Sequence, residues 1–180
     1  MKNLTVREAF AEDCYDLAGR LRQSDLDELT AAGRSSALEA LMEGFYISDK
    51  CYVCCADGEP IAMFGAWSTE AEPEVGLVWM LGTDEIEKNG TKIIRLSKIW
   101  LSKICEPYRV ATNLIDARNI THLRWLEFLG CELLEEWPNF GPEKKMFYRF
   151  IYHPLVKSEA LDARVRGDGS YQEDNPCVTL

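Results

Sequence analysis

The chain lacks any hydrophobic run long enough to cross a membrane, and it lacks the basic-then-apolar start of a secretory signal. No segment approaches the roughly 20 uncharged apolar residues that a spanning helix needs. Residues 1–8 also lack the pattern of a leader peptide. We therefore expect a soluble protein that is not secreted by that route.

Positive charge is scarce. The chain has 20 Lys and Arg against 30 Asp and Glu, a net charge of −10. Non-specific binding to nucleic acid depends on basic side chains that neutralise phosphates, so this balance argues against broad nucleic-acid binding. A local exception runs from Lys88 to Lys103, with five basic residues and no acidic one. Such a stretch is typical of a solvated helix face; the alternative is contact with an acidic partner or nucleic acid.

The cysteines are odd in number and scattered, mostly inside apolar runs. They are Cys14, Cys51, Cys54, Cys55, Cys105, Cys131 and Cys177. This distribution favours reduced thiols that act as small core residues in a reducing compartment, rather than a disulfide framework. Cys51 and Cys54 have the spacing of a metal or redox pair. However, there is no second pair at metal-binding spacing and the chain has two histidines, so we predict no metal site.

A length of 180 residues with 47% hydrophobic residues is enough for one domain with a core. Residues 1–154 hold all the periodic segments and form the predicted domain. Residues 155–180 lose that periodicity and become rich in Gly, Asp, Glu, Ser and Asn, which predicts a polar C-terminal tail.

The first half of the chain predicts a strand, two helices and three more strands. The expected strands are residues 4–6, 51–56, 60–67 and 75–81. A first amphipathic helix is expected over residues 12–29, broken near Ser24, and ends before Gly33. Ser35-Ser36 caps the second, whose apolar positions run from Leu38 to Phe45. The dipeptide Asp57-Gly58 predicts a hairpin, because both residues tolerate positive φ.

The second half predicts a helix over residues 91–105, a strand at 110–115 and a helix at 116–129 that ends at Gly130. Two further strands, 131–137 and 145–152, are expected around a turn at 138–142. The whole chain is thus α/β (α+β), in the order β-αα-β-β-β-α-β-α-β-β.

This order resembles that of the GNAT superfamily of acetyl-CoA-dependent N-acetyltransferases. In that superfamily the last helix commonly begins with Asn, followed by a small residue three positions on, Tyr seven on, and Gly-Phe eleven and twelve on. Here Asn119 is followed at those offsets by His122, Leu126, Gly130 and Cys131. The resemblance implies a mixed, mostly antiparallel sheet with helices on both faces.

A closer resemblance is to a family of GNAT-like proteins of short-tailed bacteriophages that includes small internal virion proteins. It runs from about Ala9 to Phe150. The blocks that carry it are Gly58-Glu-Pro-Ile-Ala-Met-Phe-Gly65, Trp79-Met-Leu-Gly-Thr-Asp84, Asp116-Ala-Arg-Asn119 and His122-Leu-Arg-Trp-Leu-Glu-Phe-Leu-Gly130. It implies other virion proteins as partners, self-association, and a location in the virion interior, and in the host cytoplasm during assembly.

GNAT enzymes hold the pyrophosphate of the cofactor with backbone N–H groups of a glycine-rich loop at a helix start. In the corresponding stretch, residues 84–91, only Gly90 remains as a phosphate-facing glycine, and three acidic residues bring negative charge. The candidate cofactor-binding residues are Leu81, Gly82, Lys88, Asn89, Gly90 and Thr91. The alternative is an acidic loop in which Asn89 or Thr91 caps the helix. Lys88, Lys92 and Arg95 offer compensating charge.

The proton donor to the leaving thiolate in many GNAT enzymes is the Tyr seven residues after the Asn, and this chain has Leu126 there. The candidate catalytic residues are therefore Asn119, His122 and Tyr108, with Tyr148 or Cys131 as other substitutes for the missing donor. Asn119 is alternatively a helix cap. His122 is alternatively an ordinary helix histidine, although its usual pKa suits proton transfer.

Two functional hypotheses follow. The first is a virion-associated structural or assembly component that has kept the GNAT scaffold without its standard catalysis and needs no cofactor. The rival is a working N-acetyltransferase that uses acetyl-CoA to modify a phage or host amine. The missing Tyr and glycines favour the first hypothesis.

Overall fold

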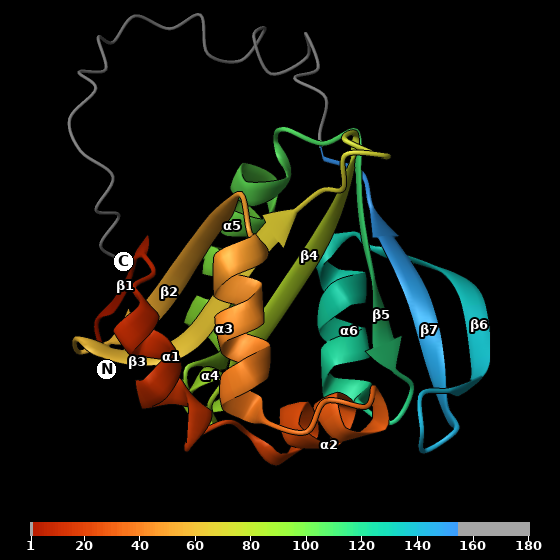
Figure 1. Cartoon of the computed structure of the whole chain (residues 1–180). Coiled ribbons are helices and arrows are strands. Elements are labelled where there is room, and N and C mark those ends of the chain that lie inside the picture. Colours follow the sequence, from red (N-terminus) through yellow and green to blue (C-terminus); the bar gives the residue numbers. More distant parts are fainter. Residues whose placement is uncertain (1, 155–180) are drawn as a thin grey trace, which may run out of the picture.

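Seven strands form one sheet in the part of the chain that the computed structural model describes, residues 2–154 (Figure 1). The order across the sheet is β1-β2-β3-β4-β5-β7-β6. The strands are β1 (Leu4–Glu8), β2 (Lys50–Ala56), β3 (Glu59–Trp67), β4 (Val75–Gly82), β5 (Val110–Asp116), β6 (Glu132–Phe140) and β7 (Lys145–Tyr152). Neighbouring strands are antiparallel except β4 and β5, which are parallel.

Helices cover both faces of this sheet. They are α1 (Ala11–Ala18), α2 (Gln23–Ala31), α3 (Ala37–Ile47), α4 (Glu85–Lys88), α5 (Gly90–Cys105) and α6 (Ile120–Leu129). The first three pack on one face around a core that includes Leu17, Leu41 and Met63. The α5 and α6 helices pack on the other face, around Trp100 and Phe150. The predicted α/β class and the seven strands are confirmed, whereas the first predicted helix is divided into α1 and α2, and α4 is added before α5.

Several local predictions are also confirmed. Asp57 and Gly58 have φ values of 52° and 88° in the turn between β2 and β3. Ser36 caps α3, since its side chain accepts a hydrogen bond from the Glu39 N–H at 3.3 Å. Gly130, with φ of 86°, ends α6 in the left-handed region, where a Cβ would be strained.

Three predicted boundaries are wrong. The helix expected over residues 12–29 divides at 19–22 rather than near Ser24, because Leu21 forms a bridge with Thr83. The helix expected from residue 116 begins at Ile120, because β5 continues to Asp116. The strand expected to end at residue 137 continues to Phe140, so the turn lies at 141–144. Pro138 is tolerated there because β6 is an edge strand.

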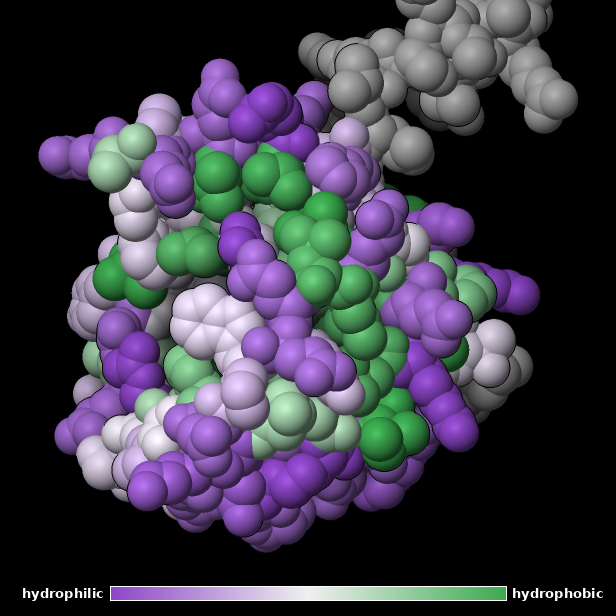
Figure 2. Space-filling view, turned by 90° about the vertical axis from the view of Figure 1, so that its right-hand side faces the viewer, coloured by the Kyte–Doolittle hydropathy of each residue, from purple (hydrophilic) through white to green (hydrophobic). Residues whose placement is uncertain are grey.

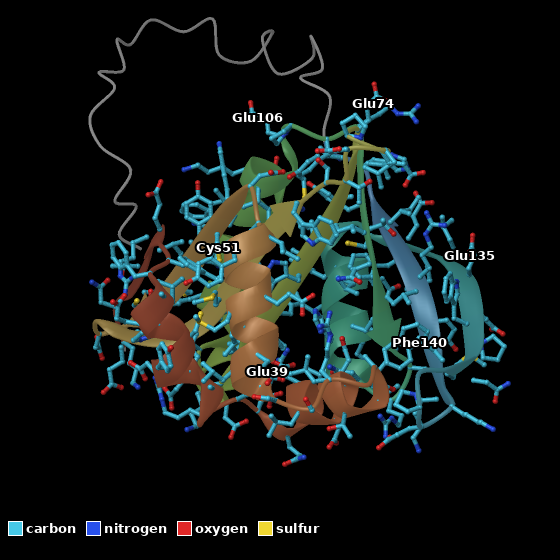
Figure 3. The ribbon with its side chains drawn as sticks, in the orientation of Figure 1. Glu39, Cys51, Glu74, Glu106, Glu135 and Phe140 are labelled. Carbon is cyan, nitrogen blue, oxygen red and sulfur yellow. The ribbon has the colours of Figure 1, made fainter. Side chains whose placement is uncertain are left out.

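The β4 and β5 strands run together at one end and diverge at the other (Figure 1). In the described chain they pair only over Val75–Leu77 and 110–112. Glu74 lies at this closed end (Figure 3), and its carbonyl accepts hydrogen bonds from the N–H groups of Arg109 and Val110, at 2.9 and 3.3 Å. Past it, the Asn113 side chain donates to the Val78 carbonyl at 2.7 Å. The divergence opens a gap in the middle of the sheet.

The six cysteines of residues 2–154 have free thiols, and Cys51 and Cys54 pack on opposite faces of the sheet. Within that range, no group of three or more His, Cys, Asp or Glu side chains is placed to hold a metal. The described helices include none that is long and apolar enough to span a bilayer. The predicted tail, residues 155–180, lies outside the described residues.

Candidate functional site: a cleft between diverging strands

The gap between β4 and β5 holds a cavity of about 410 Å³, within the size range of small-molecule sites. It reaches both faces of the sheet. Its lining comes from α3 on one side, through Gly44, and from α5 and α6 on the other, through Trp100 and Leu126. Trp79 of β4 and Phe147 of β7 form further parts of its wall. The outer side of the β6 half of the sheet also carries a band of hydrophobic residues (Figure 2).

The α2 helix lies across the open end of the gap (Figure 1). At its start, the Arg22 N–H donates to the Gly82 carbonyl at 2.9 Å, which holds it to the end of β4. Its last turn packs on the turn between β6 and β7. A Cβ on Gly141 would lie 1.9 Å from the Ala31 carbonyl oxygen, so glycine is required for this approach. Both halves of the sheet therefore hold α2 in place.

Two carboxylates of α2, three residues apart on one helix face, accept hydrogen bonds from the ends of the diverging strands. Asp25 accepts from the Gly82 N–H of β4 at 2.8 Å. Glu28 accepts from the Asp116 N–H of β5 at 3.4 Å. Because β4 and β5 have separated at this point, neither N–H group can bond to the neighbouring strand. The carboxylates of α2 accept these hydrogen bonds instead. Asp25 is itself paired with the Nε of Arg22 at 2.8 Å, and both side chains are buried.

The partly buried Glu28 has an unusual protonation equilibrium. Burial, and then the negative charge of Asp25, raise the pKa of Glu28 from 4.5 to about 7. The hydrogen bond from the Asp116 N–H and the nearby Asn119 side chain act in the opposite direction on this pKa. Glu28 lines the cleft and is therefore a carboxyl group that can give or take a proton near neutral pH.

Three buried polar atoms at the same end of the cleft have no hydrogen-bond partner within the described residues: Arg22 Nη2, Asn119 Nδ2 and His122 Nδ1. Each such atom typically costs ~1–3 kcal/mol. Burial, and then the charge of Arg22, lower the pKa of His122 to about 3, so its ring is neutral. The Asn119 side chain is near enough to Glu28 to lower its pKa. Its Nδ2 atom nevertheless lacks a partner at ordinary hydrogen-bond distance and angle. Of these three residues, His122 lines the cleft, together with Asp25 and Glu28.

The backbone of β4 also faces the cleft. The Thr83 N–H donates to Ile61 on the β3 side, whereas the Gly82 N–H and the Val78 carbonyl point to the β5 side. Because strand residues alternate, Met80 presents its peptide N–H and C=O to the gap, beyond the last β4–β5 pair. A backbone N–H in this position can donate to a carbonyl or a developing oxyanion.

The sequence-predicted cofactor residues lie at the end of β4 and at the junction of α4 and α5. Gly82 uses its N–H for Asp25 and its carbonyl for Arg22, and Leu81 lines the cleft. Glu85 in α4 binds the ammonium groups of Lys2 and Lys88, each at 2.7 Å. These two hydrogen bonds lower the pKa of Glu85 to about 2.

Short hydrogen bonds occupy the rest of this junction. The Asn89 side chain donates to the Glu85 carbonyl at 2.8 Å, and the Asn89 carbonyl accepts from Lys92 N–H at 3.0 Å. Gly90 and Thr91 begin α5. These hydrogen bonds connect α4 to the first turn of α5 through Asn89. The sequence did not predict the short helix α4. A cofactor role for these residues remains a prediction.

The catalytic candidates are not all brought together. Asn119 caps α6 by accepting a hydrogen bond from the His122 N–H at 3.2 Å, and both residues lie beside Glu28 and Arg22. Tyr108 lies just before the opposite end of β5, where its hydroxyl donates to Asp49 at 2.7 Å. Burial and that contact raise the pKa of Tyr108 above its usual value.

The other substitutes are also placed by the fold. Burial raises the pKa of Cys131 to about 12, which keeps it a thiol. Tyr148 lies on β7, opposite Ile115 of β5. Leu126 is buried in the α5–α6 core and lines the cleft.

Sequence reasoning missed Arg22, Asp25 and Glu28. Charged residues on an amphipathic helix normally face water, so their spacing alone gave no signal. Their role becomes visible only in the folded structure, where α2 lies against the ends of both β4 and β5.

No model of a known protein family matches the chain, and no curated protein matches its sequence. Solved structures do share its architecture. Ard1 from Thermoplasma volcanium superimposes with a TM-score of 0.65 at 13% identity, over 84% of this chain and 98% of that one. A GNAT-family acetyltransferase from Streptococcus pneumoniae gives a TM-score of 0.57 at 13% identity, over 83% and 98%.

A Bacillus subtilis acetyltransferase in complex with CoA gives a TM-score of 0.60 at 14% identity, over 86% of this chain and 100% of that one. Identities this low establish the fold alone. The chain has the GNAT fold, a mixed and mostly antiparallel sheet with helices on both faces, as predicted.

Proposed function

We propose that this protein is a bacteriophage GNAT-fold component that associates with the virion as a structural or assembly protein and does not carry out standard acetyl transfer. The observation that carries the proposal is the state of the α4–α5 junction. A carboxylate held ionised by two lysines stands where the GNAT resemblance implies a pyrophosphate, and Lys88 is committed to it.

The missing proton donor supports the same proposal. Leu126 cannot protonate a leaving thiolate. Tyr108 is bonded to Asp49 and lies near the closed end of the β4–β5 pair, whereas Asn119 and His122 lie at the open end. Because the pKa of His122 is lowered to about 3, its ring is not protonated near neutral pH. It therefore has no imidazolium proton to give to a leaving thiolate.

The virion association is supported by the resemblance of residues 9–150 to the phage family. The surface is compatible with it, because five large apolar side chains of α6 and β6 are more than two-fifths exposed. These are Ile120, Phe128, Leu133, Leu134 and Trp137. Exposed apolar side chains that gather into one patch are typical of protein contacts.

Calorimetric titration with acetyl-CoA and with CoA tests the catalytic part of the proposal. We expect no binding at micromolar concentrations. Micromolar binding that is lost when Met80 is replaced by Pro, which removes the cleft-facing N–H, would overturn it. Mass spectrometry of purified virions tests the structural part: the chain should be present at a fixed copy number, and its absence from particles would contradict the assembly role.

An N-acetyltransferase is the second candidate, favoured by the parted β4 and β5 strands and the Met80 peptide in the gap. On this hypothesis acetyl-CoA occupies the cleft, and Glu28, with its pKa of about 7, accepts a proton from the substrate amine. Acetylation of phage or host proteins that requires Glu28 would support it.

A further inference from the structure

The side of the sheet that carries α5 and α6 has opposite charge at its two borders. The α5 helix has four basic residues and no acidic one, and its Arg95, Lys98 and Lys103 side chains are exposed. The α6 helix lies beside it, since the Lys98 ammonium group is 5.7 Å from the centre of the Phe128 ring. The edge strand β6, which follows α6, has three glutamates and no basic residue. We call this surface the α5–β6 face.

The middle of the α5–β6 face is apolar and open. Ile99 of α5, Phe128 of α6 and Leu133 of β6 are 54%, 55% and 51% exposed. Leu133 lies on the helix side of the sheet, because its cross-strand partner Phe150 packs in the α5–α6 core. Every β6 residue from 132 to 139 is exposed, so no described element covers this strand. Figure 2 shows a band of hydrophobic residues on this side of the molecule.

A basic border, an apolar centre and an acidic border are together complementary to a second copy of the same face. A two-fold axis through α6 places α5 of one copy against β6 of the other, and the same contact then forms twice. Glu136 belongs to the acidic border, because its cross-strand partner Tyr148 packs against the α5–α6 core. A partner with one sign of charge would match one border and be repelled by the other.

We propose that the protein forms a closed two-fold dimer through the α5–β6 face, with the Phe128 side chains near the axis. This inference deepens the proposed assembly role by naming a second copy of the chain as a partner, and its use in the virion rests on that role. The pairing itself requires neither a virion nor CoA, so it can be measured on the purified chain. Its failure would leave the test on purified virions undecided and separate.

Sedimentation equilibrium of the full chain should show monomers and dimers at micromolar concentration and no larger species. Phe128→Asp should weaken the dimer about a hundredfold or more, because it places two unpaired charges in the apolar centre. Phe10→Asp is the matched control and should leave the dimer unchanged. Phe10 is 58% exposed, lies under the Arg7 guanidinium at 5.1 Å, and precedes α1 on the opposite side of the sheet. A chain that stays monomeric at submillimolar concentration, or that grows into open assemblies, would overturn the proposal.

The contact between α5 and β6 is tested by reversing one exposed charge on each element. Lys98→Glu and Glu136→Lys should each weaken self-association about tenfold or more, since like charges then meet twice in every dimer. In a mixture of the two variants, both contacts again join opposite charges, so heterodimers should form about as tightly as the natural dimer. A mixture that associates no more tightly than either variant alone would show that α5 and β6 do not meet, and would overturn the proposal even if Phe128→Asp fails to fold.

Discussion

The two ends of the β4–β5 pair show two ways of satisfying a strand edge. At the closed end, the strands pair directly over Val75–Leu77 and 110–112. At the open end, the N–H groups of Gly82 and Asp116 donate hydrogen bonds to two carboxylates of α2. This arrangement requires Arg22 and Asp25 to be buried together as an ion pair. The first solution joins the strands by backbone hydrogen bonds alone, and the ionisable side chains beside it, such as Tyr108 and Asp49, bond to each other and not to the strand edge. The second is electrostatic, so it should respond to charge, to pH and to ligands.

The largest effect should follow from Asp25→Ala at the open end. This change leaves the Arg22 guanidinium buried without its partner and frees the Gly82 N–H. We expect a loss of ~3–5 kcal/mol in the free energy of unfolding, measured by urea denaturation. Asp27→Ala, on the exposed face of the same helix, should change it by less than ~0.5 kcal/mol. A loss below ~1 kcal/mol for Asp25→Ala would mean that the buried pair contributes little.

At the closed end, Gly76→Ala should cost less and act through packing alone. A Cβ on Gly76 would lie 2.3 Å from the Tyr108 ring, and that ring is held by the hydrogen bond to Asp49. We expect a loss of ~1–3 kcal/mol that is the same at pH 5 and pH 8. Gly19→Ala is the control, because a Cβ added there would meet no atom within 4 Å and the φ of Gly19 is −82°. Thermal denaturation of both variants at the two pH values checks this expectation.

The pH response at the open end can be isolated with Glu28→Gln. The pKa of Glu28 is raised from 4.5 in the unfolded chain to about 7 in the fold. Its contribution to stability is therefore fully present below about pH 4.5 and is lost as the pH rises through 7. The Gln variant does not titrate, so it should match the natural chain at pH 4.5 and exceed it at pH 8. We expect ~1–2 kcal/mol, since Glu28 is only partly buried.

Chemical denaturation across this pH range measures the effect, with Glu12→Gln as an exposed control. A stability difference that stays constant from pH 4.5 to pH 8 would show that Glu28 keeps its ordinary pKa.

The same contrast explains what the sequence could predict. The helix ends and the hairpin that depend on local chemistry follow from the sequence: Asp57-Gly58, Ser36 and Gly130 act locally, and each was predicted correctly. The open end depends on contacts between residues far apart in the chain, such as Asp25 with Gly82 and Gly141 with Ala31. The helix break at residues 19–22 was misplaced for the same reason, since the bridge from Leu21 to Thr83 decides it. Asn119 and His122 were identified as candidates, but their neighbours Arg22 and Glu28 were not.

The smallest effect is expected at Asn113, which lies just past the last paired residues of β4 and β5. The Asn113 side chain donates to the Val78 carbonyl at 2.7 Å and its oxygen accepts from the Leu114 N–H at 2.7 Å, so it bridges the strands where pairing stops. Asn113→Ala should cost ~1 kcal/mol, the usual net value of one such hydrogen bond. If the bridge sets where the strands part, amide exchange should quicken at residues 78–80 and remain slow at 75–77. Uniformly faster exchange along β4 would instead show that the bridge supports the whole strand pair and does not define the edge of the cleft.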